Sequence, residues 1–116
     1  MAELTALEKL QPALLDRLCD NDPTQRAESR DSRVMTRQQM RQAVLRDLAW
    51  LFNATQSLKP ADVAGLDEVR GSVINYGLPS LSGTTVTSVD TGSLEQQIRR
   101  AILDFEPRIM AETLRV

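Results

Sequence analysis

Acid–base chemistry in this chain would fall to carboxylates, because its 116 residues include no histidine. Hydrolysis of a glycosidic bond needs two carboxyl groups roughly 5 to 9.5 Å apart across a cleft. Glu106 could form such a pair with Asp104 or with Glu112. However, a small domain leaves little room for a deep cleft, and the chain offers only one Trp, one Tyr and two Phe as sugar platforms. We therefore expect no hydrolase activity.

The sequence offers few residues for nucleophilic catalysis or metal binding. Cys19 is the one cysteine, and the chain has no histidine to activate it. Ser80 and Ser82 lack a G-x-S-x-G setting. A zinc site needs several Cys or His ligands, which this composition does not supply. We expect a protein that is not an enzyme and that uses no metal or cofactor.

Glu106, Pro107 and Arg108 form a different kind of candidate site. Pro107 has a fixed φ, so the charged side chains on either side of it keep a reproducible relative position. Such a pair suits protein binding, because Arg forks onto a partner's carboxylate and Glu accepts from a partner's Arg. The same pair could instead close the preceding helix as an internal brace. The sequence leaves both interpretations open.

Trp50 and Arg46 form a second candidate for protein binding. They lie one turn apart on the polar side of a predicted helix, close enough for the guanidinium to stack on the indole. An exposed Trp beside an Arg is typical of residues that anchor interfaces. The alternative is that a loop of the same domain covers the indole.

Two principal helices are predicted to position these residues. The first spans residues 36–55 and opens with a capping box of Thr36 and Gln39. The second begins at Ser93, with Gln96 as its capping partner, and Pro107 stops it. Their apolar faces comprise Met40, Val44, Leu45, Leu48, Leu51, Phe52 and Thr55 in the first helix, and Leu94, Ile98, Ala101, Ile102 and Phe105 in the second.

Residues 112–116 alternate in polarity, which predicts a C-terminal strand with Leu114 and Val116 on one face and Arg115 on the other. A strand needs hydrogen-bonding neighbours. Residues 72–76 could provide one, although periodicity does not decide whether they are helix or strand. Another protein, or strands that this sequence lacks, could provide it instead. The predicted fold class is α+β: a small single domain with two principal helices packed on a short C-terminal sheet.

Residues 1–33 differ from the rest of the chain: they predict a short helix followed by a polar linker. Thr5 and Glu8 have capping-box spacing, and residues 12–19 predict a short helix with an apolar face of Leu14, Leu15 and Leu18. So short a helix must dock on something to be stable. We predict a docking helix in residues 1–19, a flexible polar linker in residues 20–33, and a folded domain in residues 34–116. The helix is either an arm for a partner or folds back onto its own domain.

Charge and hydropathy limit the partners. No apolar run approaches the roughly 18 residues of a membrane span, and the N-terminus lacks a signal-peptide pattern, so we expect a cytoplasmic protein without direct membrane insertion. Residues 26–46 contain six arginines against two acids, whereas residues 47–95 contain six acids against two bases. This asymmetry suits nucleic acid, or a subunit between an acidic and a basic neighbour. The arginine run lacks interleaved aromatic residues, which favours protein neighbours and no nucleic acid.

Four segments together resemble one protein family. They are LLDRL at residues 14–18, VLRDLAWLFNAT at 44–55, SVINYGLPSLSG at 72–83, and IRRAILDFEPRI at 98–109 before TLRV. Their order resembles the lysozyme-like baseplate wedge proteins of contractile phage tails. The run NYGLP followed by FEPR is the most specific part, and LLDRL points to the TssE branch, which belongs to type VI secretion systems.

The resemblance implies a structural role in the bacterial cytoplasm, at the baseplate on the inner-membrane side. Proteins of this branch assemble with the wedge subunits TssF, TssG and TssK, connect the baseplate to the first ring of the contractile sheath, and help to start sheath assembly. The Glu-Pro-Arg motif of the family, which faces the wedge core, matches Glu106, Pro107 and Arg108.

The resemblance also implies that the C-terminal strand, at Leu114, Arg115 and Val116, shares its edge with sheath subunits. The family usually continues through further strands, so we expect this chain to lack the last ones. The alternative function is a wedge protein of a phage-type contractile tail, followed by a wall-sugar hydrolase or a nucleic-acid-binding module.

Overall fold

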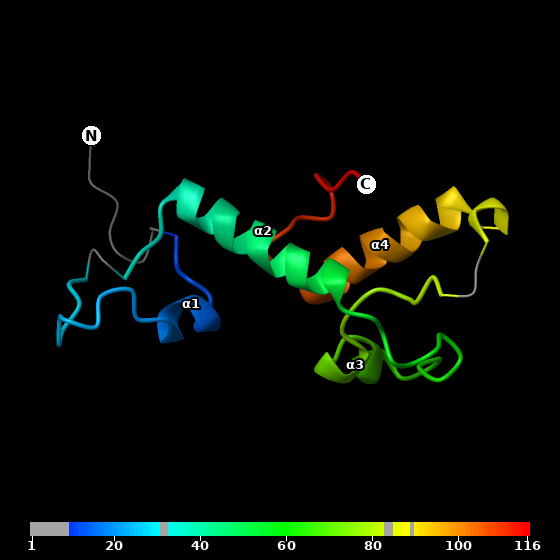
Figure 1. The fold of residues 1–116 in the computed structure, drawn as a ribbon, viewed down its shortest axis with the longest axis horizontal. Helices are drawn as coiled ribbons and strands as arrows, with labels where there is room; N and C mark the ends of the chain where they lie inside the picture. Colours follow the sequence, from blue (N-terminus) through cyan, green and yellow to red (C-terminus); the bar gives the residue numbers. More distant parts are fainter. Residues whose placement is uncertain (1–9, 31–32, 83–84, 89) are drawn as a thin grey trace. The chain divides into compact units, whose positions relative to one another are not determined.

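A computed structural model describes residues 10–30, 33–82, 85–88 and 90–116 of the chain. The elements in these ranges are α1 (Leu14–Leu18), α2 (Arg37–Asn53), α3 (Asp67–Arg70), the 3₁₀ turns η1 (Val73–Asn75) and η2 (Val86–Ser88), and α4 (Thr91–Phe105) (Figure 1). The chain divides into two compact units, Met1–Leu45 and Arg46–Val116, and α2 contributes to both. None of the helices in the described ranges has the length and apolar character needed to cross a bilayer.

The predicted α+β class is wrong, because the described ranges contain helices and turns but no strand or sheet. The pairing that does occur is limited to two isolated bridges, Leu10 with Met35 and Thr55 with Leu78. The two principal helices are confirmed as α2 and α4, so the error concerns what packs against them.

The predicted C-terminal strand at residues 112–116 is a turn followed by irregular backbone. The N–H of Thr113 donates to the carbonyl of Met110 at 3.2 Å, which curls the chain. Arg99 of α4 donates to the carbonyls of Leu114 and Ala111 at 2.6 and 2.9 Å. These carbonyls are therefore satisfied by a side chain, and the segment has no neighbouring strand in the described ranges.

Helix α2 begins as predicted. The N–H of Thr36 donates to Gln39 Oε1 at 2.9 Å, and the N–H of Gln39 donates to Thr36 Oγ1 at 3.2 Å, which confirms the capping box. The predicted apolar face is too wide, however, because Leu45 and Phe52 are 55% and 43% exposed. At about 100° per residue, both lie on the same edge of that face.

Helix α4 begins two residues earlier than predicted. Asp90 is its N-cap, and its carboxylate accepts a hydrogen bond from the N–H of Gly92 at 3.2 Å. The predicted capping box of Ser93 and Gln96 is therefore wrong, because an acceptor closer to the true first turn was available. The buried face is confirmed at Ala101 and Ile102, and the helix ends at Phe105, as the following Pro107 predicts.

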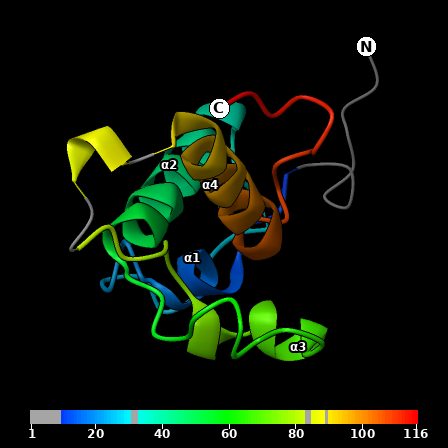
Figure 2. The ribbon, with the colours of Figure 1, turned by 90° about the vertical axis from the view of Figure 1, so that its right-hand side faces the viewer.

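The connection between α2 and α4 contains α3 and η1 (Figures 1 and 2). Gly65 has a φ of 77°, in the left-handed region that favours glycine. Residues 72–76, left undecided above, contain the 3₁₀ turn η1. Gly77 has a φ of 125°, and a Cβ there would lie 2.5 Å from the carbonyl oxygen of Ala54. Only glycine allows the connection to approach the end of α2 this closely.

In the first unit, α1 is shorter than the predicted span of residues 12–19. The N–H of Met35 donates to the carbonyl of Leu10 at 2.9 Å, so the two ends of the intervening loop meet. The predicted capping pair of Thr5 and Glu8 lies outside the described residues. The proposed division into docking helix, linker and domain stays a prediction.

Candidate functional site

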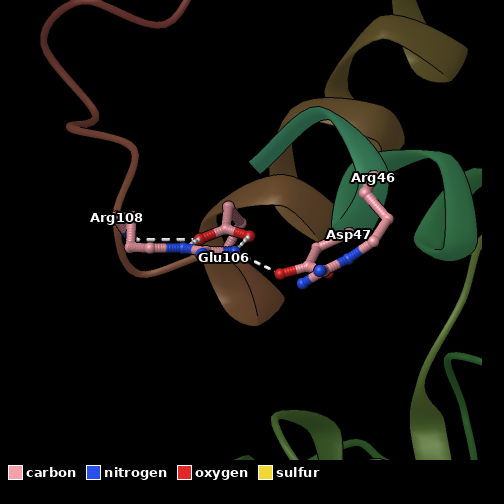
Figure 3. A network of polar contacts seen from close by, with 4 residues as sticks. All are labelled: Arg46, Asp47, Glu106 and Arg108. Atoms are coloured by element: carbon pink, nitrogen blue, oxygen red, sulfur yellow. Dashed lines mark hydrogen bonds and ion pairs between the residues drawn. The ribbon is translucent and has the colours of Figure 1, made fainter. Parts of the chain in front are cut away.

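The Glu106–Arg108 pair lies immediately after α4. Glu106 is the C-cap of the helix, and its N–H donates to the carbonyl of Ile102 at 2.8 Å. Arg108 returns to the Glu106 carboxylate with Nε at 2.6 Å from Oε1 and Nη2 at 2.7 Å from Oε2 (Figure 3). Pro107 between them sets the turn that allows this two-point contact. The Glu106 side chain is only 5% exposed, so its charge is compensated within the chain.

Asp47 of α2 extends this pair into a network. Arg108 Nη2 also donates to Asp47 Oδ2, across a sequence separation of 61 residues. Arg46 donates through Nε to Asp47 Oδ1 at 2.9 Å. Figure 3 shows the carboxylate of Asp47 between the two arginines. The network therefore fastens α2 to the chain that follows α4, within the second unit.

The electrostatics keep the network ionised. The hydrogen bond to Glu106 raises the pKa of Arg108 above its usual value; burial opposes this rise and Asp47 adds to it. Burial alone would raise the pKa of Asp47, but hydrogen bonds and charge attraction from Arg108 and Arg46 outweigh burial and lower it. Both groups therefore carry their charges at neutral pH.

Tyr76 and Phe105 form an aromatic pair near the network. Their rings meet edge to face, with centroids 5.3 Å apart. Burial raises the pKa of Tyr76, and the nearby charges of Asp47 and Glu106 raise it further. Tyr76 comes from the NYGLP segment and Phe105 from the FEPR segment, so the two most specific parts of the resemblance meet here.

The predicted pair of Arg46 and Trp50 adjoins the network, because Arg46 is bonded to Asp47. The guanidinium carbon of Arg46 is 5.1 Å from the ring centroid of Trp50, which confirms the predicted stacking. Trp50 is 52% exposed. Arg46 thus contacts both the half-buried Asp47 and the exposed indole of Trp50.

The structure brings together Glu106, Arg108, Arg46 and Trp50 among the predicted site residues. Asp47 was missed, because no local pattern indicates a contact across 61 residues. The remaining predicted residues lie elsewhere: Leu114 is half-buried at Arg99 and Arg115 and Val116 are exposed, while Leu14, Leu15 and Leu18 belong to the first unit.

The carboxylates considered for hydrolysis are engaged in ion pairs or isolated. Glu106 is held by Arg108. Asp104 lies 3.8 Å from the side chains of both Arg70 and Arg100. Glu112 is exposed beyond the helix. What this arrangement does offer is a fixed charge network with a half-exposed aromatic beside it, which suits a protein contact.

The Glu-Pro-Arg turn of this network belongs to one of the four segments on which the baseplate resemblance rested. The comparison with protein families agrees: residues 38–116 match the family described as baseplate wedge protein gp25. The match covers more than half of the chain and contains the whole network, so the chain belongs to this family. No match was found among the curated proteins or the solved structures.

Proposed function

We propose that this chain is the TssE-type wedge subunit of a type VI secretion baseplate. In this role it connects the baseplate to the first ring of the contractile sheath and helps to start sheath assembly, on the cytoplasmic side of the inner membrane. Two features support the proposal. The chain belongs to the baseplate wedge family over residues 38–116, and the LLDRL segment at residues 14–18 precedes the matched region.

The observation that carries a structural role is the network around Asp47. Four charged side chains fix α2 relative to the end of α4, and the fixed Arg46 supports the exposed Trp50. A surface that is already ordered loses little conformational entropy when a partner binds. We assign the partner contact to Trp50, Arg46 and the Glu106–Arg108 turn, and the partners to TssF, TssG, TssK and the sheath subunits, without nucleic acid.

A non-enzymatic role belongs to the same proposal. Glycoside hydrolysis requires one carboxyl group that donates a proton and another that attacks or activates water. Both carboxylate oxygens of Glu106 accept hydrogen bonds from Arg108, and Asp104 is flanked by two arginines. This engagement favours assembly over catalysis.

The test is co-purification of the chain with TssF, TssG and TssK. The variants are Trp50→Ala and a Glu106→Ala/Arg108→Ala double variant, with Lys59→Ala as an exposed control. Circular dichroism and urea unfolding follow each variant in parallel. We expect wild type and the control to be retained, and Trp50→Ala to be retained poorly while it stays folded.

The double variant separates the two roles of the Glu-Pro-Arg turn. If it stays folded but loses the wedge subunits, the turn makes an assembly contact. If it unfolds, the turn is an internal brace and its interface role is withdrawn. A wild-type chain that binds none of the three subunits would overturn the proposal.

A second candidate is a wedge protein of a phage-type contractile tail, which membership of the baseplate wedge protein gp25 family also supports. Such a protein would assemble with tail wedge proteins rather than with TssF, TssG and TssK. The same co-purification, repeated with phage tail subunits, distinguishes the two.

A further inference from the structure

Residues 110–116 return along α4 after the Glu-Pro-Arg turn (Figure 2). Arg99 lies more than one helical turn before Phe105, the last residue of α4, yet its guanidinium reaches this segment. Nη1 donates to the carbonyl of Leu114 at 2.6 Å, and Nη2 donates to the carbonyl of Ala111 at 2.9 Å. One side chain of α4 thus binds the segment at two points.

The other hydrogen bonds of residues 110–116 are local in the part of the chain that the structure describes. The N–H of Thr113 donates to the carbonyl of Met110 at 3.2 Å, and its Oγ1 donates to the same carbonyl at 3.1 Å. Leu114 is half-buried, and the remaining side chains of the segment are exposed. A segment with few buried apolar contacts and few hydrogen bonds to its surroundings opens at a low cost in free energy.

The base of this segment is held more firmly. Ile109 is half-buried, and its N–H donates to the carbonyl of Glu106 at 3.2 Å. Arg108 is bound to the carboxylates of Glu106 and Asp47. Attachment therefore changes from firm to weak between Ile109 and Met110. Residues 110–116 form a strap with a fixed base, and Arg99 is its latch.

Arg99 has a second acceptor within reach on its own helix. Glu95 precedes it by four residues and is exposed, so the two side chains lie on the same side of α4. A carboxylate is a stronger acceptor for a guanidinium than a main-chain carbonyl, but an exposed ion pair contributes little because water competes with it. The two sets of contacts are therefore close enough in free energy to compete for Arg99.

The other charged groups of α4 and the strap leave this competition to Arg99 and Glu95. Arg100, the next residue along α4, lies 3.8 Å from the carboxylate of Asp104. Glu112 and Arg115 of the strap are exposed. The strap is bound to α4 through its main-chain carbonyls and not through these charges.

We propose that residues 110–116 are a strap with two positions. In the docked position, Arg99 binds the carbonyls of Ala111 and Leu114. In the detached position, Arg99 pairs with Glu95, and the strap leaves α4 while its base at Ile109 stays in place. Detachment frees a guanidinium with two donors and uncovers Leu114. This inference concerns the second unit alone, so it does not depend on the proposed function.

Limited proteolysis of the full chain with thermolysin measures how often the strap detaches. Thermolysin cleaves before apolar residues, and a cut between Thr113 and Leu114 requires the docked strap to open. When opening and closing are fast relative to cleavage, the rate follows the population of the open form. We expect Arg99→Ala to be cut there about tenfold or more faster than wild type. Glu95→Gln should be cut about twofold more slowly, because the detached position loses its ion pair.

Matched controls change neighbouring or comparable charges. Arg100→Ala removes the next arginine of α4, and Glu68→Gln neutralises an exposed acid in α3. Both should be cut at the wild-type rate. NMR spectra of ¹⁵N-labelled protein locate the change: in Arg99→Ala, the heteronuclear NOE should fall in residues 110–116 while α2 and α4 keep their values.

Four outcomes would overturn the inference. Cutting of Arg99→Ala at the wild-type rate excludes Arg99 as the latch. A loss of order that spreads through α4 means that the strap does not detach by itself. Cutting of Glu95→Gln at the wild-type rate or faster excludes the second position of Arg99. Faster cutting of either control removes the assignment to these two residues. All four are measured without partner subunits, so they are scored separately from the proposed function.

Discussion

At the scale of single residues, the site depends on how one buried carboxylate is compensated. Glu106 is 4% exposed, yet it ends a helix and lies next to a proline, where the chain itself provides few donors. Arg108 supplies its backbone N–H and two guanidinium nitrogens to this carboxylate. Because Arg108 also binds Asp47, the same guanidinium compensates two acids from distant parts of the sequence.

Replacing Arg108 with Ala should leave Glu106 buried without its partner. We expect the free energy of unfolding to fall by about 2–4 kcal/mol, as measured by urea unfolding. Arg108→Lys keeps the charge but not the two-point contact, so its loss should be smaller. The exposed Arg115→Ala serves as control and should change stability by less than about 0.5 kcal/mol. Equal stability of Arg108→Ala and wild type would mean that the pair is not a brace.

Asp47 predicts how stability responds to acid. Its pKa is lowered in the folded chain from the ordinary value of 3.8, so the unfolded chain takes up a proton first as the pH falls. The contribution of Asp47 to the free energy of unfolding is therefore fully present above about pH 5. It is lost as the pH falls through 3.8 toward the pKa of Asp47 in the folded chain. The measurement is urea unfolding at a series of pH values from about 3 to about 6, which extends beyond this range at both ends. The free energy of unfolding should fall more steeply with decreasing pH for wild type than for Asp47→Asn. Parallel curves would contradict the assignment.

At the scale of elements, the NYGLP segment approaches the end of α2 closely at Gly77. The N–H of Leu78 donates to the carbonyl of Ala54 at 2.9 Å, and the N–H of Gln56 donates to the carbonyl of Leu78 at 2.9 Å. These bonds lie on either side of the contact at Gly77. The neighbouring Tyr76 packs edge to face on Phe105 at the end of α4.

Gly77→Ala should be costly, because the added Cβ meets backbone at 2.5 Å and the φ is 125°. We expect a loss of more than about 1 kcal/mol in the free energy of unfolding. Gly71→Ala is the matched control: its φ is −86° and its nearest contact, to the Asp67 carbonyl, is 3.8 Å. It should be neutral or slightly stabilising. If both variants lose the same stability, the close approach at Gly77 does not matter.

At the scale of the whole molecule, the chain consists of two units with different surfaces. The second unit holds the charge network and lies entirely within the region that matches the wedge family. The first unit contributes α1 and a stretch, residues 17–30, in which every side chain is exposed. The two units therefore differ in surface: one carries a charge network held by internal contacts, and the other a long stretch of exposed side chains.

Trp50 is the only tryptophan, so its fluorescence reports on one site in the whole molecule. At 52% exposure, it should be quenched readily by acrylamide in the free chain. In tryptophan-free variants of the proposed wedge partners, complex formation should shift its emission to shorter wavelength and reduce quenching at least about twofold, because the interface excludes water. Trp50→Phe supplies the blank. A complex that forms without either change would place the interface elsewhere.

Local signals in the sequence determined several features of this protein. The capping box at Thr36 and Gln39, the stop at Pro107 and the stacking of Arg46 on Trp50 each depend on residues within one or two turns of one another. Glu106 and Arg108, two residues apart, could likewise be recognised as a pair. The family resemblance also came from short segments in order, and residues 38–116 bear it out.

Tertiary structure alone decided the features that depend on distant contacts. Asp47 joins Arg108 across 61 residues, so no spacing rule predicts it. The alternation at residues 112–116 predicted a strand, but strand formation depends on a neighbour, and Arg99 takes two of the nearby carbonyls instead. The edge of α2 that is buried, and hence the exposure of Leu45 and Phe52, also depends on what packs against the helix. A local pattern fixes the conformation of a segment, whereas burial and long-range charge pairing depend on the segments that surround it.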